Sequence, residues 1–123
     1  MRHAAGMDVV AYVLVGLVAA LHLYFLVLEM FLWTKPAGRQ IFGTDAAFAE
    51  KSTVLAANQG LYNGFLAAGL LWGLVDDQTD VQVFFLACVI VAGAYGAATV
   101  NKRILVVQAV PAVLALIAVL AAS

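Results

Sequence analysis

Four long apolar stretches that are almost free of charge constrain this chain more than any other feature of its sequence. A helix needs about 20 apolar residues to cross about 30 Å of hydrocarbon, and each stretch meets or approaches that length. Only one charged residue, Glu29, lies inside any of them. Backbone groups in lipid must be hydrogen-bonded internally, so these stretches are predicted to be helices. The sequence predicts an all-α membrane protein with four transmembrane helices in an up-and-down bundle. The expected spans are residues 9–33, 53–75, 81–100 and 104–121.

The composition agrees with this class and excludes others. Apolar residues make up 66% of the chain and charged residues 11%, against roughly half and roughly a quarter in a soluble domain. The formal net charge of -1 provides no basic surface for nucleic acid. The high apolar content makes the lipid bilayer the expected surrounding of the chain. The single cysteine, Cys88, excludes an internal disulfide, and no Cys/His spacing resembles a structural zinc site.

The chain is predicted to form a single transmembrane domain, residues 9–123, after an N-terminal extension, residues 1–8. Its first apolar stretch is longer than the roughly 7 to 15 residues of a signal-peptide core, so we expect that helix to be retained.

The loop of residues 34–52 has room for structure of its own. Pro36 is expected to break the helix after Trp33. Thr44 is predicted to cap a short helix over residues 45–51, which would lead along the membrane interface into the second span.

The basic residues predict an orientation. Lysine and arginine accumulate in the loops of residues 34–52 and 101–103, whereas the acidic turn of residues 76–80 and the C-terminal tail have none. Because cytoplasmic loops carry an excess of Lys and Arg, both basic loops are predicted to be cytoplasmic.

The polar side chains of the spans are predicted to gather at similar depths. Counted from the expected helix ends, Glu29 is level with Asn58, and His22, two turns away on the same face, is level with Asn63. An unsatisfied amide or carboxylate in lipid costs several kcal/mol, so these groups should face a common interior. We predict a polar pocket open towards the cytoplasm. Its expected members are His22, Glu29, Asn58, Gln59, Tyr62, Asn63, Tyr95 and Gln108.

Small residues spaced four apart are predicted to bring the helices close together, because packing rather than hydrophobicity drives helix association in lipid. The pairs are Gly60 with Gly64, Gly69 with Gly73, and Gly93 with Ala97. They fit contacts within one chain and contacts within a homodimer equally well.

Two strings, HLYFLVLEMFLW (22–33) and NQGLYNGFLAAGL (58–70), carry a resemblance to a known family. The chain resembles the small bacterial membrane proteins grouped as domain of unknown function thirteen hundred and four. The resemblance implies four membrane helices and a multi-pass protein of the bacterial inner membrane. It implies no activity, so every residue role comes from the residues themselves.

Three functions stay open. A carboxylate inside a membrane is functional by default, so Glu29, with His22, is the candidate for acid–base or proton-carrying work. The first hypothesis is binding, with transport, of a small amphipathic or cationic molecule by the amides and phenols around Glu29. In plan only, this resembles the small multidrug resistance transporters.

The second hypothesis is a membrane enzyme in which Glu29 or His22 moves a proton on a lipid-soluble substrate. The third is a structural subunit of a membrane complex. No metal site is predicted, because His22 and Glu29 are seven residues apart and the remaining candidates are amides and phenols, which are poor ligands. No motif names a cofactor, which stays unknown.

Overall fold

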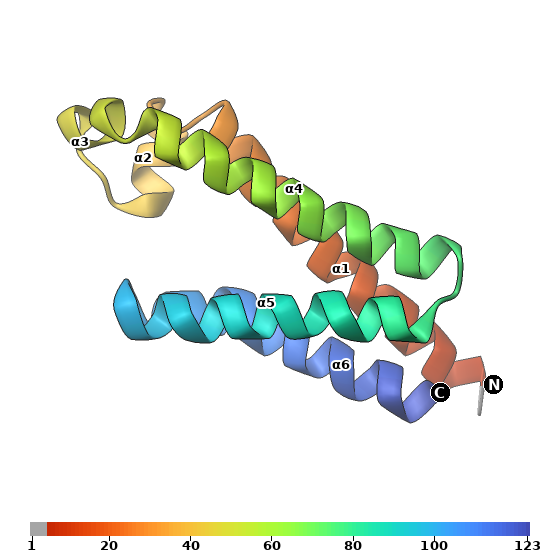
Figure 1. Ribbon diagram of the computed structural model, residues 1–123. Helices are drawn as coiled ribbons and strands as arrows, with labels where there is room; N and C mark the ends of the chain where they lie inside the picture. The colour runs from red at the N-terminus through yellow and green to blue at the C-terminus, as the bar shows by residue number, and fades with distance from the viewer. Residues whose placement is uncertain (1–4) are drawn as a thin grey trace. The chain divides into compact units, whose positions relative to one another are not determined.

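The computed structural model describes residues 5–123, and every regular element in that range is helical. The predicted all-α fold is therefore confirmed. The elements, shown in Figure 1, are α1 (Ala5–Met30), α2 (Pro36–Phe42), α3 (Ala46–Lys51), α4 (Thr53–Val75), α5 (Thr79–Thr99), a π-helical turn η1 (Leu105–Ala109) and α6 (Val110–Ala122). Of the expected extension, residues 1–4 lie outside the described part of the chain, and residues 5–8 are the first residues of α1.

Three helical segments in the described range are long and apolar enough to cross a membrane, where the sequence predicted four. They are Asp8–Met30, Thr79–Thr99 and Leu105–Ala122. α4 has the length, with 23 residues, but Asn58, Gln59 and Asn63 lower its hydropathy. These three amides, which are also candidate site residues, make α4 too polar to be identified as a membrane span from its hydropathy.

The chain divides into two compact units. The larger unit comprises Ala68–Ser123 together with the chain up to Ala19, and the smaller unit is Ala20–Ala67.

In the larger unit, α5 packs along η1 and α6 (Figure 1). Small residues allow this approach: a Cβ atom added to Gly93 would lie 2.8 Å from the Cβ of Ala109. The buried face of α6 is mostly alanine and consists of Ala112, Ala115, Ala118, Val119 and Ala122. Gly93 therefore makes its contact within one chain, one of the two alternatives that its sequence left open.

The last predicted span begins with a π-helical turn instead of a regular α-helix. Pro111 has no N–H, and its ring would collide with the carbonyl of Val107 in an uninterrupted α-helix. The backbone N–H of Val110 instead donates to the carbonyl of Leu105, five residues back. This wider turn places Gln108 within η1, where a single π-helical turn absorbs the strain around the proline.

The turn between α4 and α5 is closed by backbone caps and one buried side chain. Asp77 adopts a left-handed conformation with φ 52°, and the N–H of Gln78 donates to the carbonyl of Gly73, the arrangement of a Schellman C-cap. The same carbonyl accepts a second hydrogen bond, 2.8 Å long, from Nε2 of buried Gln82. Gln82 holds α5 against the end of α4, a role that the sequence analysis did not assign to it.

Substituting Gln82→Leu is expected to lower the free energy of unfolding by only about 1 kcal/mol, because the Gly73 carbonyl keeps its bond from Gln78. Unfolding of the purified protein in detergent, followed by far-UV circular dichroism, measures this. A loss of more than about 3 kcal/mol would mean that Gln82 has a partner besides Gly73.

In the smaller unit, the two short helices correct the expected boundaries. α1 ends at Met30, three residues before Trp33, and Pro36 starts α2 at its first turn, where a missing N–H has no effect. The N-cap of α3 is Asp45, whose carboxylate accepts from the N–H of Phe48, so Thr44 was the wrong cap by one residue. An aspartate is at least as good a cap as a threonine and adds a favourable charge.

The Trp33 side chain connects the end of α1 to the start of α4. Its indole N–H donates to the hydroxyl of Ser52 over 2.9 Å, and its ring lies 4.9 Å from that of Phe42. The loop of residues 34–52 is consequently a folded part of this unit.

Candidate functional site

The site lies where α1 and α4 approach each other in the smaller unit. A Cβ atom on Gly60 would lie 2.6 Å from Met30 Cγ, 3.1 Å from Glu29 Cβ and 3.2 Å from the Leu26 carbonyl oxygen. One on Gly64 would lie 2.7 Å from a methyl group of Leu26. Gly60 and Gly64, predicted as a packing pair, therefore form the contact face of α4 against α1 within a single chain.

Glu29 and Asn63 form a buried hydrogen bond across this contact. Nδ2 of Asn63 donates to Oε1 of Glu29 over 2.5 Å, and the two residues are only 5% (Asn63) and 9% (Glu29) exposed. A carboxylate offers about four acceptor positions, of which the amide uses one. The bond joins two residues that are 34 apart in sequence.

This pairing corrects the predicted register. Glu29 was expected level with Asn58, whereas its partner is Asn63, five residues further along α4. The depth count assumed that α1 and α4 end at one level. α1 ends at Met30, one residue after Glu29, while α4 begins at Thr53, ten residues before Asn63. The start of α4 thus extends beyond the end of α1, and α2 and α3 occupy the connection between them.

His22 is completely buried. Its ring makes an edge-to-face contact with Phe25 at 5.4 Å between ring centres. It precedes Glu29 by seven residues, which places both on the same face of α1. The structure thus keeps His22 and Glu29 on a common buried stripe, as their spacing predicts.

The remaining polar residues of α4 have exposed side chains. Gln59 is exposed and precedes Asn63 by one helical turn, so the two residues share a face of α4. Asn58 and Tyr62 point away from Gly60, because they lie about 160° from it around the helix at 100° per residue. The structure brings Asn63 to Glu29 and does not bring Asn58 or Tyr62 to it.

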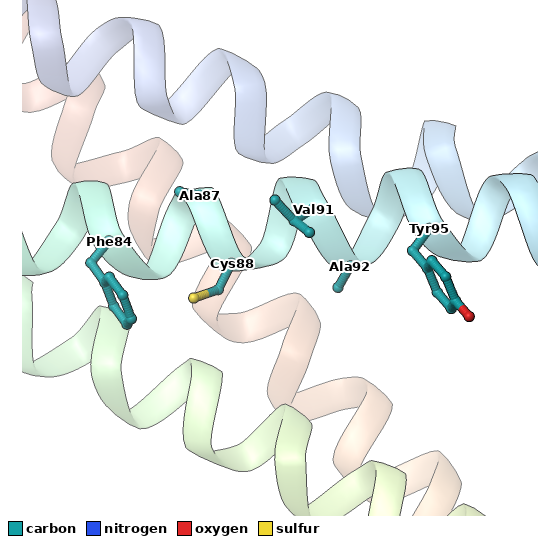
Figure 2. A pocket seen from close by; sticks show the side chains of 6 residues that line it. All are labelled: Phe84, Ala87, Cys88, Val91, Ala92 and Tyr95. Atoms are coloured by element: carbon teal, nitrogen blue, oxygen red, sulfur yellow. The ribbon is translucent and has the colours of Figure 1, made fainter.

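Tyr95 and Gln108 belong to the larger unit, and their predicted place beside Glu29 stays a prediction. Tyr95 is exposed at one end of an apolar hollow of about 560 Å³. Figure 2 shows Phe84, Cys88, Ala92 and Tyr95 along one side of α5. The Thr99 hydroxyl, one turn on, donates to the Tyr95 carbonyl over 2.7 Å. Gln108 is half-buried in η1.

The described residues contain no group of three or more His, Cys, Asp or Glu that could hold a metal ion. What the site offers is a single carboxyl group with a neutral amide donor and an imidazole two turns away. These groups can bind a proton or a cation, or orient a polar molecule.

Together these features define a helical protein with membrane-length apolar helices and a buried carboxyl–amide pair. The chain belongs to the family described as "Protein of unknown function (DUF1304)", whose model matches residues 16–120. The match agrees with the resemblance carried by residues 22–33 and 58–70.

The chain is also similar to "Uncharacterized protein YpaA" of Lactococcus lactis subsp. lactis (strain IL1403). The two are 31% identical over 115 residues, which cover 90% of this chain and 97% of the relative. No solved structure matches the chain. Neither description assigns an activity.

Proposed function

We propose that the protein is a four-span integral membrane protein that binds, and transports, a small amphipathic or cationic molecule at Glu29. The observation that carries the proposal is the environment of this carboxyl group. It is buried, and its hydrogen-bond partner is the neutral amide of Asn63. An intramembrane carboxyl group without a cationic partner is a natural place for a proton or a cation to bind.

The sequence places no Lys or Arg inside the apolar stretches that could neutralise Glu29. All six Lys and Arg residues lie outside them, in the N-terminal segment and the two basic loops. Burying a lone carboxylate is costly, so a chain that keeps one in this position gains most if a ligand or proton neutralises it. The amide of Asn63 holds the carboxyl group in place, and the exposed Gln59, one turn before Asn63 on α4, is proposed to contact a ligand.

α4 is proposed as the fourth span although its composition is less apolar than that of the others. It has 23 residues, which is enough to cross the hydrocarbon layer, and it packs against α1 through Gly60 and Gly64. A helix that covers a buried carboxyl group needs polar side chains on that face. We propose the same orientation as the basic loops indicate, with residues 34–52 and 101–103 in the cytoplasm.

The test is native mass spectrometry of the purified protein, released from detergent with and without the lipophilic cation tetraphenylphosphonium. The wild type is expected to carry the cation, or a co-purified small molecule, and Glu29→Gln to bind it at least about tenfold more weakly. The matched control is Glu50→Gln, which removes the other glutamate, an exposed one in α3, and should bind like the wild type.

Equal spectra for all three proteins would contradict the proposal and favour a structural role for the pair. A bound neutral lipid that Glu29→Gln retains without turning over would favour the membrane-enzyme hypothesis, in which Glu29 acts on the substrate after binding.

A further inference from the structure

Two buried polar atoms in the loop of residues 34–52 have no hydrogen-bond partner in the described part of the chain. They are Nε of Arg39 and the hydroxyl oxygen of Thr44. Both side chains are half-buried, and the proposed role of Glu29 uses neither of them. Buried polar groups in proteins are almost always hydrogen-bonded, so two unsatisfied groups this close in sequence need an explanation.

The C-terminal turn of α2 brings Arg39 and Thr44 together. Gly43 adopts a left-handed conformation with φ 68°, and its N–H donates to the Arg39 carbonyl. The N–H of Thr44 donates to the same carbonyl over 3.1 Å. Arg39 and Thr44 are therefore neighbours in space, held by the backbone of a helix cap.

α2 also lies against the end of α1. A Cβ atom on Gly38 would collide with the carbonyl oxygen of Leu32, two residues after the last residue of α1. α1 contains the candidate membrane span Asp8–Met30. Arg39 follows Gly38 in sequence, so it is fixed close to the point where this span would leave the hydrocarbon layer.

The charges of the loop favour an anion. Residues 34–52 contain three basic side chains against two acidic ones. Lys35 precedes Arg39 by one helical turn, and Lys51 ends α3. Of the acidic side chains, Asp45 is engaged as the N-cap of α3, and Glu50 is exposed.

We propose that Arg39 and Thr44 bind the phosphate group of an anionic phospholipid. Arginine presents its N–H donors as a planar fork that fits two phosphate oxygens, and Nε–H is one arm of this fork. The threonine hydroxyl donates to a third oxygen. A rotation of the two half-buried side chains turns these donors towards the headgroup as it binds.

The surroundings favour a phospholipid over a soluble phosphate. Ile41, between the two residues in sequence, is 43% exposed, and Phe48, four residues after Thr44, is 55% exposed. Exposed apolar side chains next to basic ones are typical of segments that lie in the membrane interface. Basic pockets at the ends of membrane helices bind anionic headgroups. Phosphatidylglycerol combines acyl chains with a negatively charged phosphate.

The inference rests on α1 as a membrane span, and not on α4 or on a ligand at Glu29. The test is native mass spectrometry of the purified protein in detergent, titrated with phosphatidylglycerol or phosphatidylcholine. The wild type is expected to bind phosphatidylglycerol about tenfold more tightly than phosphatidylcholine, and Arg39→Gln to lose this preference. The matched control is Arg103→Gln, which removes the same charge from the other basic loop and should bind within about twofold of the wild type.

The role of the hydroxyl is tested without any change of charge. Thr44→Val keeps the shape of the side chain and is expected to raise the dissociation constant for phosphatidylglycerol about threefold. Thr34→Val, at an exposed threonine of the same loop, should leave it unchanged. The Thr44 hydroxyl has no partner in the described protein, so Thr44→Val should not lower stability in SDS unfolding without anionic lipid.

Three results would overturn the inference. Equal affinity of the wild type for the two lipids would show that the headgroup is not recognised. Equal losses for Arg39→Gln and Arg103→Gln would show that net charge, and not a site, determines binding. Binding of inorganic phosphate that Arg39→Gln abolishes, with no preference between the lipids, would assign the pair to a soluble anion.

The lipid site and the Glu29 site are tested separately. Glu29→Gln should bind phosphatidylglycerol like the wild type, and Arg39→Gln should bind tetraphenylphosphonium like the wild type. Failure of one proposal therefore leaves the other unaffected.

Discussion

Substituting Gly93→Val is expected to lower the free energy of unfolding by about 3 kcal/mol, the upper part of the range for overpacked interiors. A Cβ atom at position 93 would lie 3.1 Å from the backbone nitrogen of Ala109 and 3.2 Å from its Cα. Backbone atoms cannot rotate out of the way as a long side chain can. The valine therefore forces α5 away from η1, and the alanine face of α6 loses contact with it.

Gly16→Val is the matched control, because a Cβ atom at Gly16 of α1 has no neighbour within 4 Å. Its effect should stay within about 1 kcal/mol, since only helix propensity changes. Both variants and the wild type are unfolded with SDS in mixed micelles and followed by far-UV circular dichroism. Similar losses for the two variants would show that propensity, and not the approach of α5 to η1, decides the outcome.

Substituting Asn63→Leu is expected to destabilise the protein by about 2 to 3 kcal/mol, because it leaves the buried carboxyl group of Glu29 without its donor. Most of this effect is the penalty of an unsatisfied buried group and not the strength of the lost bond. The same SDS unfolding experiment measures it. Gln59→Leu, an exposed amide one turn away on α4, is the matched control and should change stability little.

The double variant Glu29→Leu with Asn63→Leu makes the prediction sharper. Replacing both partners by apolar residues of similar size removes the unsatisfied group, so stability should return to within about 1 kcal/mol of the wild type. The double variant should still bind tetraphenylphosphonium more weakly than the wild type, because it lacks the carboxyl group of Glu29. If the double variant is instead as unstable as the sum of the two single variants, the two side chains do not act as a pair.

Of the predicted site residues, the structure joins Glu29 and Asn63 by a hydrogen bond, and it does so in a register that the sequence did not predict. An intramembrane glutamate, a histidine two turns from it and amides in the next helix are all visible in the sequence. The partner of Glu29 was not, because counting depth from assumed helix ends requires those ends to be level. α1 ends three residues earlier than predicted, and α2 and α3 lie between its end and the start of α4. These two differences make Asn63, and not Asn58, the partner of Glu29.

The same limit applies to Gln82 and to η1. Gln82 is a polar residue in the first turn of an apolar helix, which is a visible signal, but only the folded turn shows that it reaches the Gly73 carbonyl. The proline at position 111 predicts a disturbance of the last helix. Whether the helix kinks, breaks or forms a π-helical turn next to this proline depends on how the helix packs.

The sequence by itself determined the class of this protein: helices of membrane length, charges confined to their ends, and one carboxyl group left within. These follow from the free energy of moving a charge or an unpaired backbone group into hydrocarbon, which depends on residue type and segment length alone. Only the tertiary structure decided that Gly60 and Gly93 make their close contacts within one chain, that Glu29 pairs with Asn63, and that Asn58 and Tyr62 point the other way. The reason is that side-chain pairing depends on register and rotation between helices, and a shift of a few residues changes both without changing the pattern of apolar residues.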